Sequence, residues 1–533
     1  MRRNLGSFIQ RPGQELLYIL IVWVGIFLLC PNSSAAEKPR SGGMLRYHIL
    51  PPRSLDPHME ASSSTPQIVN NVYSQLIKQD LDMNSYILDL AESWKRTDDL
   101  TYIFKIHKGV RFQNIPPVNG RELTSEDVKY SIERLGGMHG NKIEFRHRYY
   151  FEGKLASIET PDKYTIIFKT KAPYAPFLNY LASPWACIVP KEAVENLKGK
   201  AIGSGPFILK EFVRGSHALL EKNPNYFKKG LPYLDQIHIK IMSDETALLS
   251  AFLAGELDMA ELPESKIPTA KKEIPNAGIV MGDTFFMRGL RFRPWTEGPS
   301  PVKPPFNDIR VRKAICLAID KKKVLQMAHE GYGKIQVGPV PNWPPYSLPE
   351  SDQIEYNPKK AKNLLTEAGY PNGFSAEMPT WNYPSMNKAA QTIQEMLKEV
   401  GVNIELKPME LAQLTNLTRN MNYDIGFLPW ASGVDPEDFL TGYFGNLESA
   451  VHFKWNNKEI IQMTEEQSKI LDKEKRVAAI HKIQRKVLED APMVLIYTQP
   501  LFMVYKPYVH PKTLHRNGNA RFSFAEKIWM DKR

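Results

Sequence analysis

The chain has 533 residues, with 69 Lys or Arg and 58 Asp or Glu, which gives a formal net charge of +11. Its length exceeds one ordinary domain and predicts about three or four modules. A basic chain can bind nucleic acid or an anionic surface, but these cations are spread along the sequence and no nucleic-acid motif accompanies them. A solvated basic surface is therefore favoured, and no nucleic-acid partner is expected.

Residues 1–36 have the pattern of a signal peptide. A basic leader precedes the apolar run Leu16–Cys30, which is shorter than the roughly 20 residues of a bilayer-spanning helix. Ser34 and Ala36 then supply the small side chains that favour cleavage. An uncleaved anchor and lipidation at Cys30 remain as alternatives, so we expect a periplasmic chain that is either free or attached to the membrane.

Cysteine usage argues against a disulfide-rich scaffold. Of the three cysteines, Cys187 and Cys316 lie beyond the predicted signal peptide. Both have apolar surroundings, where a buried free thiol is common. An exported chain could also join them in a disulfide, but we expect two free thiols.

The first half of the remaining chain alternates strand and helix patterns. Residues 43–50 form a predicted strand that Pro51 ends, and residues 65–78 form a predicted helix. Thr124 has the position of an N-cap, because acidic residues follow in the first turn of the next predicted helix. Further strands are predicted at 164–169, 207–212 and 217–221.

The stretch from residue 203 to residue 260 carries strong local signals. A turn is predicted at Gly203–Pro206, because glycine tolerates positive φ and proline fixes its own φ. Ile237–Ile241 alternates apolar and polar residues, as in a half-buried strand. A helical pattern runs from Asp244 to a C-cap at Gly255, and a strand follows from Leu257. This order predicts a parallel strand pair joined by a right-handed crossover.

In the second half, apolar residues recur at helical spacing over 311–319 and 393–400. Strands are predicted at 403–407 and 423–430. The apolar faces of these elements are core residues by default, so they indicate a fold and carry no functional information.

The order of these motifs closely resembles the family 5 (peptide/nickel/opine) extracytoplasmic solute-binding proteins, which feed ABC importers. The resemblance implies a two-lobed α/β fold of the periplasmic-binding-protein type (type II, large) with an extra subdomain. It also implies a ligand cleft between the lobes, which close over the ligand. The matching blocks are Ser54–His58, Leu90–Phe112, Leu123–Val128, Gly203–Met259, Pro305–Ile315 and Tyr356–Tyr370.

The chain has no Gly/Ser/Pro-rich linker, low-complexity run or internal repeat. Lobes assembled from discontinuous segments would explain this absence. With the resemblance, we predict an extra subdomain at 81–202 and lobe II at 288–499. Lobe I then takes the segments 37–80, 203–287 and 500–533.

The resemblance also implies a binding site after the predicted strand 423–430. In peptide-binding relatives this strand ends in a tryptophan, and an aspartate three residues later pairs with the α-amine of the peptide. Trp430 is present here, but Gly433 stands in the place of the acid. Asp435 is the nearest carboxylate and could replace it, although a role as N-cap of the helix starting at Pro436 is favoured. We therefore expect a ligand without a free α-amine, or one whose amine pairs with Asp435.

Other candidate ligand contacts follow from the same resemblance. Tyr497 matches a tyrosine on the hinge side of the cleft, and with Trp430 it is favoured because both rings combine an apolar body with a polar tip. For every candidate, plain packing is an equally good explanation. The remaining candidates are Pro429, Ala431, Ser63, Trp185 and Trp381.

No enzyme or metal protein is predicted. The sequence has no Gly-x-Ser-x-Gly elbow, no P-loop lysine and no cysteine–histidine arrangement typical of a thiol nucleophile. Its 12 histidines lack the short spacings of a zinc site. We therefore expect no catalytic residue, no cofactor and no metal.

The sequence thus predicts a monomeric, periplasmic substrate-binding component of an ABC importer. Its ligand would be a peptide or a similar small organic solute, and its partner an ABC permease with its ATPase in the inner membrane. Two alternatives stay open: a stand-alone module for sensing or chaperoning, and a receptor for a metal chelate or an opine-like ligand.

Overall fold

The computed structural model describes residues 38–59, 62–139, 145, 147–293, 305–429, 433–445, 455–511, 514 and 521–531. Residues 41–533 belong to one compact unit, and the predicted signal peptide lies outside the described residues. The secondary structure is mixed α/β, as predicted. The boundaries assigned above to lobes and subdomain stay predictions.

The first sheet has the strand order β1-β10-β9-β8. Its alternation is confirmed, because Ile237, Ile239 and Ile241 are all buried. Strand β1 runs parallel to β10, and the other two pairs are antiparallel. The strands are β1 (Met44–Ile49), β10 (Gln236–Ile241), β9 (His217–Lys222) and β8 (Phe207–Val213).

The helix after β10 is confirmed, but the following strand pairs differently. Helix α5 (Glu245–Leu253) starts from the N-cap Asp244, and Gly255 follows it at φ +76°. Strand β11 (Met259–Glu261) then pairs antiparallel with β17 (Met493–Tyr505). The predicted parallel pair is therefore wrong, because β1 and β9 already occupy both edges of β10.

The helix predicted over 65–78 is shorter than expected. Helix α2 (Thr65–Val69) ends at Asn70, and strand β2 (Ile77–Gln79) follows in a hairpin with β3 (Tyr86–Leu88). The side chain of Asn71 donates a hydrogen bond to the main-chain oxygen of Gln67 at 2.9 Å. Asparagine bonds of this kind compete with helical hydrogen bonds and favour turns.

The glycines of the predicted turn serve a different purpose from the one expected. Neither Gly203 nor Gly205 has a positive φ. A Cβ atom at Gly203 would lie 2.2 Å from the main-chain oxygen of Val72. These glycines are thus required because two backbone segments pack closely together.

A second four-stranded sheet has the order β4-β5-β7-β6, with helix α3 (Ser125–Leu135) against it. The predicted N-cap is confirmed: Thr124 forms a capping box with Asp127. Helix α4 (Phe177–Leu181) follows this sheet in the chain. The strands are β4 (Ala91–Arg96), β5 (Thr101–Ile106), β7 (Thr165–Thr170) and β6 (Leu155–Asp162).

A seven-stranded sheet has the order β11-β17-β12-β16-β14-β15, with β13 also on β17. Its remaining strands are β12 (Gly278–Phe292), β13 (Lys334–Ile335), β14 (Phe374–Trp381), β15 (Val402–Met409) and β16 (Ile425–Pro429). The helices of this region are α7 (Ile309–Ala318), α8 (Lys321–His329), α9 (Pro358–Glu367), α10 (Pro384–Glu399), α11 (Leu411–Arg419), α12 (Pro436–Phe444), α13 (Lys458–Gln467) and α14 (Lys473–Asp490).

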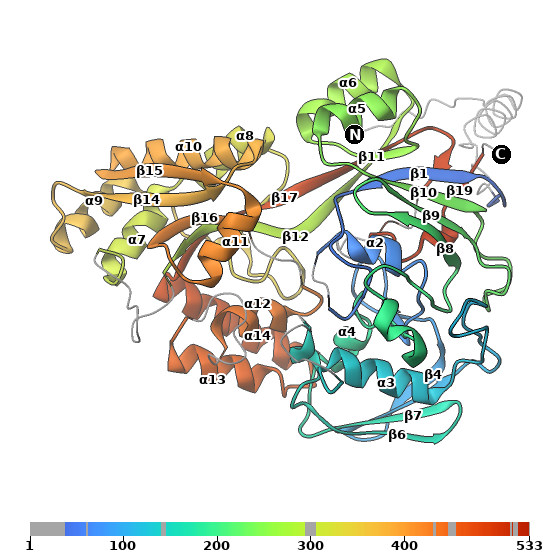
Figure 1. Cartoon of the computed structure of the whole chain (residues 1–533). Helices are drawn as coiled ribbons and strands as arrows, with labels where there is room; N and C mark the ends of the chain where they lie inside the picture. Colours follow the sequence, from blue (N-terminus) through green and yellow to red (C-terminus); the bar gives the residue numbers. More distant parts are fainter. Residues whose placement is uncertain are drawn as a thin grey trace, which may run out of the picture. The chain divides into compact units, whose positions relative to one another are not determined.

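Strands β12 and β17 are long and connect two parts of the molecule (Figure 1). Residues 278–283 of β12 pair with 500–505 of β17, next to β11. After a register shift, residues 287–291 pair with 493–498, next to β16. A bulge of this kind bends a strand locally. The register shift lies at the predicted boundary between lobes I and II.

Two hydrophobic clusters cover the paired segments 287–291 of β12 and 493–498 of β17. Leu290, Val494 and Ile496 pack with residues of α7, α8 and α10, whereas Met287 and Leu495 pack with residues of α12 and α14. Cys187 and Cys316 are buried free thiols, as predicted.

Candidate functional site

Four residues lie next to one another across the seven-stranded sheet, where β14 and β16 end. Strands β14 and β16 run parallel, so their carboxyl ends, at Trp381 and Pro429, lie at the same edge. Arg288 of β12 pairs with Pro429, and Tyr497 of β17 pairs with Arg288. We call these four residues the strand-end row. Ligands of open α/β sheets bind outside the carboxyl ends of strands, so the row marks a candidate binding site.

Tyr497 offers a buried hydroxyl to this site. The side chain is fully buried, and within the described residues its hydroxyl has no hydrogen-bond partner. Burial raises the pKa of the phenol, and the nearby Arg288 lowers it by a smaller amount. The ring of His329 in α8 meets the tyrosine ring edge-on, with 5.2 Å between the centroids. Because a buried hydroxyl is normally hydrogen-bonded, this one is suited to bonding a ligand.

Arg288 is a member of the row that the sequence analysis missed. Its guanidinium donates hydrogen bonds to the main-chain oxygen of Met287 at 3.0 Å and to the side-chain oxygen of Gln499. The residue is 5% exposed, and burial lowers its pKa. A basic residue inside the apolar pattern Phe285–Leu290 is the signal that could have identified it.

Polar contacts between the two predicted lobes lie beside the row. Trp381 stacks on Tyr383 with 4.6 Å between the ring centroids. The Tyr383 hydroxyl donates a hydrogen bond to Glu245 of α5 at 2.6 Å. His329 forms a comparable contact of 2.9 Å with Glu264. These contacts join segments assigned to lobe II with segments assigned to lobe I.

The other predicted site residues are not joined to the row. Trp430 and Ala431 lie outside the described residues. Trp185 is buried and stacks on His147 with 4.7 Å between the centroids. The main-chain oxygen of Ser63 accepts a hydrogen bond from Gln67 at 3.0 Å. In the described part of the chain, no polar or ring contact links Ser63 or Trp185 to Arg288 or Tyr497.

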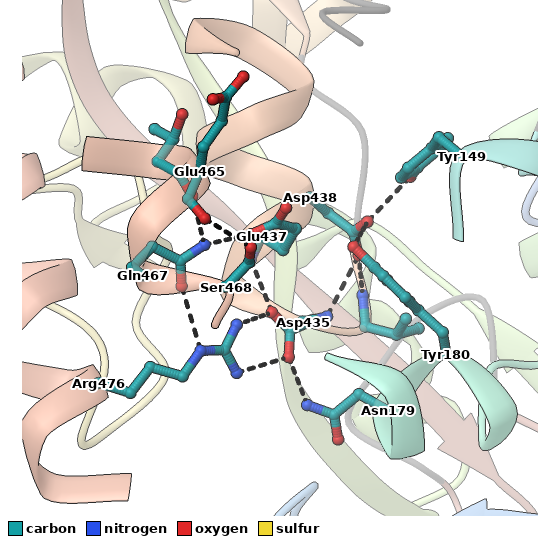
Figure 2. A network of polar contacts seen from close by, with 12 residues as sticks. Tyr149, Asn179, Tyr180, Asp435, Glu437, Asp438, Glu465, Gln467, Ser468 and Arg476 are labelled. Atoms are coloured by element: carbon teal, nitrogen blue, oxygen red, sulfur yellow. Dashed lines mark hydrogen bonds and ion pairs between the residues drawn. The ribbon is translucent and has the colours of Figure 1, made fainter. Parts of the chain in front are cut away.

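Asp435 is the centre of a buried polar network (Figure 2). It is the N-cap of α12, as the favoured alternative predicted, and accepts a hydrogen bond from the Glu437 amide at 2.8 Å. The Arg476 guanidinium binds both carboxylate oxygens, at 2.5 and 3.0 Å. Asn179 of α4 adds a hydrogen bond of 2.6 Å. The charge of Asp435 is thus already balanced by protein groups, and a ligand role for it stays an untested prediction.

Two further carboxyl groups extend this network. Burial, together with the nearby charge of Asp435, raises the pKa of Glu437 to about 7. Burial also raises the pKa of Asp438 to about 6, although hydrogen bonds to its carboxylate oppose this. Tyr149 and Tyr180 donate to Asp438 at 2.9 and 3.2 Å, so α12 is tied to the segment before β6 and to α4 (Figure 2).

The loop before α12 leaves no space for an acid at Gly433. A Cβ atom at Gly433 would lie 2.6 Å from Cβ and 2.8 Å from a carboxylate oxygen of Asp438. An aspartate at this position would therefore require α12 to move. This contact gives a structural reason for the glycine in the place where amine-binding relatives have an acid.

The described residues contain no group of three or more potential ligands arranged to hold a metal ion. Over the same ranges, no helix combines the length and the apolar character needed to cross a membrane.

The comparisons with known proteins identify the family. The sequence profile described as "Bacterial extracellular solute-binding proteins, family 5 Middle" matches residues 85–450. The chain therefore belongs to the family 5 extracellular solute-binding proteins, which are binding proteins of ABC transporters.

Particular relatives match nearly the whole chain. The "Oligopeptide-binding protein AppA" of Bacillus subtilis (strain 168) is 29% identical, over 92% of this chain and 93% of the relative. The structure of AppA from Bacillus subtilis with a nonapeptide has a TM-score of 0.76 and 25% identity, over 93% of this chain and 100% of that one. The structure of DppA from Helicobacter pylori with the peptide STSA has a TM-score of 0.80 and 24% identity, over 92% and 99%. These likenesses confirm the predicted two-lobed fold.

Replacing Tyr497 by Phe is expected not to lower the free energy of unfolding, because it removes a buried hydroxyl that has no hydrogen-bond partner among the described residues. The matched control is Tyr180→Phe, which removes the hydrogen bond to Asp438 and should cost about 1–2 kcal/mol. Urea denaturation of the purified variants measures both values. An equal loss in the two variants would show that the Tyr497 hydroxyl has a structural partner.

Proposed function

We propose that the chain is the substrate-binding component of an ABC importer and captures peptides at the strand-end row. The observation that carries this proposal is the match to an oligopeptide-binding protein over 92% of the chain. Related structures are described in complex with a nonapeptide, with the peptide STSA and with Met-Leu. The buried Tyr497 hydroxyl and the Arg288 guanidinium, beside the carboxyl ends of β14 and β16, supply polar groups for such a ligand.

In this proposal the predicted signal peptide exports the chain, and the mature protein acts as a periplasmic monomer. The lobes close over the ligand by bending at the register shift of β12 and β17, where the sheet crosses from one lobe to the other. The closed form then delivers the ligand to an ABC permease.

The proposal also concerns how the peptide is recognised. Gly433 leaves no space for an amine-binding acid, and Asp435 is already paired with Arg476. A buried ammonium needs a paired charge. The ligand is therefore one whose α-amine is not bound at residues 433–435.

A panel of ligands tests the function. We expect Met-Leu, the peptide STSA or a nonapeptide to raise the melting temperature of the mature protein, because a ligand that binds only the folded form stabilises it by about 2.7 kcal/mol at a hundredfold excess over Kd. N-acetylation of the active peptide should have little effect. Small-angle X-ray scattering should show a smaller radius of gyration at saturation.

Haem serves as the comparison ligand, because a "Heme-binding protein A" of Haemophilus influenzae (strain ATCC 51907 / DSM 11121 / KW20 / Rd) is 27% identical over 82% of the chain. Stabilisation by haem and by none of the peptides would contradict the proposed ligand class. An unchanged radius with a bound peptide would contradict closure of the lobes.

A further inference from the structure

We infer that Arg288 binds a carboxylate of the ligand and that the protein therefore prefers acidic solutes. The inference rests on the proposed function and adds to it the chemical group that the site selects. Arg288 lies in the middle of the strand-end row, between Pro429 on one neighbouring strand and Tyr497 on the other.

The pairing of Arg288 differs from that of three other buried arginines, Arg134, Arg476 and Arg312. Arg134 binds Asp56 at 2.6 Å, and Arg476 binds Asp435 at 2.5 Å. Arg312 lies 3.8 Å from Asp490 and also donates to several main-chain oxygens. Among the described residues, Arg288 instead has two neutral acceptors, Met287 and Gln499, and no carboxylate within ion-pair distance.

This arrangement leaves donors for a ligand. A guanidinium carries five N–H donors in a planar fork, and the two acceptors named above cannot satisfy all of them. A buried cation without a paired charge is costly, and a carboxylate that binds the fork with two hydrogen bonds removes this cost. The site thus gains more from an acidic ligand than from a neutral one.

Neighbouring groups point to the same chemistry. Tyr497 is the cross-strand partner of Arg288, so both side chains lie on one face of the sheet. Over the described ranges, the Tyr497 hydroxyl and Nε2 of His329 are buried without a hydrogen-bond partner. His329 meets the tyrosine ring edge-on. The Tyr497 hydroxyl can therefore donate to the same carboxylate that Arg288 binds, from the neighbouring strand.

The carboxylate has two possible sources, the C-terminus of a peptide or an acidic side chain. Affinity selection with mass spectrometry distinguishes them, with pools of tri- to pentapeptides offered to the mature protein. One pair of pools carries free or amidated C-termini, and the other pair carries Glu or Gln inside peptides with amidated ends. The proteins tested are the wild type, Arg288→Gln, Arg288→Lys and a control, Arg293→Gln. Arg293 is a buried arginine just beyond β12 that pairs with Asp424.

We expect the wild type to bind the acidic member of at least one pair about 30-fold more tightly, the lower end of what a buried charge pair provides. Arg288→Gln should lower this ratio to near one, Arg288→Lys should keep part of it, and Arg293→Gln should keep all of it. Circular dichroism first establishes that each variant is folded. If Arg288→Gln does not fold, the acid preference of Arg288→Lys tests the inference.

The outcomes separate this inference from the proposed function. Equal binding of acidic and neutral pools by the wild type, or a full acid preference in the folded Arg288 variants, would overturn the inference and leave the peptide function standing. Retention of no peptide by the folded wild type would overturn the proposed function and this inference with it.

Discussion

Replacing Arg476 by Met is expected to lower the free energy of unfolding by about 3–5 kcal/mol, because it leaves a buried carboxylate without its partner. Asp435 is fully buried and is bound by both terminal nitrogens of Arg476. Its other hydrogen bonds, from Asn179 and the Glu437 amide, do not supply a compensating charge. Urea denaturation followed by circular dichroism measures the loss.

The matched control lies on the same helix. Arg485 of α14 forms an exposed ion pair with Asp352 at 2.9 Å. Arg485→Met should shift the urea midpoint far less than Arg476→Met, because exposed ion pairs contribute little to stability. Similar shifts for the two variants would contradict the assignment of Arg476 and Asp435 as a structural pair.

Replacing Glu437 by Gln is expected to stabilise the protein at pH 8 by about 3 kcal/mol, with little effect at pH 4.5. The pKa of this carboxyl is raised from 4.5 to about 7 in the folded protein. Below pH 4.5 the carboxyl is protonated in both the folded and the unfolded chain. Between pH 4.5 and pH 7 only the unfolded chain ionises, so stability falls as the pH rises.

The difference between the variant and the wild type should therefore grow from pH 4.5 to pH 7 and then remain constant. Thermal unfolding across this range checks the prediction, with Glu474→Gln as an exposed control on α14 that should show no such trend. A difference that does not change with pH would show that folding does not raise the pKa of Glu437.

Local sequence signals predicted much of the secondary structure. The alternation in β10, the helix that follows Asp244 and the glycine at the end of that helix depend on nearby residues, and all three are confirmed. The partner of β11 could not be predicted in this way, because the choice between β10 and β17 depends on strands far away in the sequence. A turn was predicted at Gly203, but glycine is required there because the backbone packs against Val72, which is distant in the sequence.

The candidate site was predicted only in part. Tyr497, Pro429 and Trp381 were candidates from the family resemblance, and the structure places them near one another beside the carboxyl ends of β14 and β16. Arg288 carried no motif, and its burial depends on strands more than a hundred residues away. The pairing of Asp435 with Arg476 joins residues 41 positions apart, so the spacing of the α12 motif could not indicate it.

A crystal structure with a peptide that raises the melting temperature tests the central claim most directly. The peptide should lie at the carboxyl ends of β14 and β16, in contact with Tyr497 and with a carboxylate within hydrogen-bond distance of Arg288. A peptide that contacts neither Arg288 nor Tyr497 would contradict the claim.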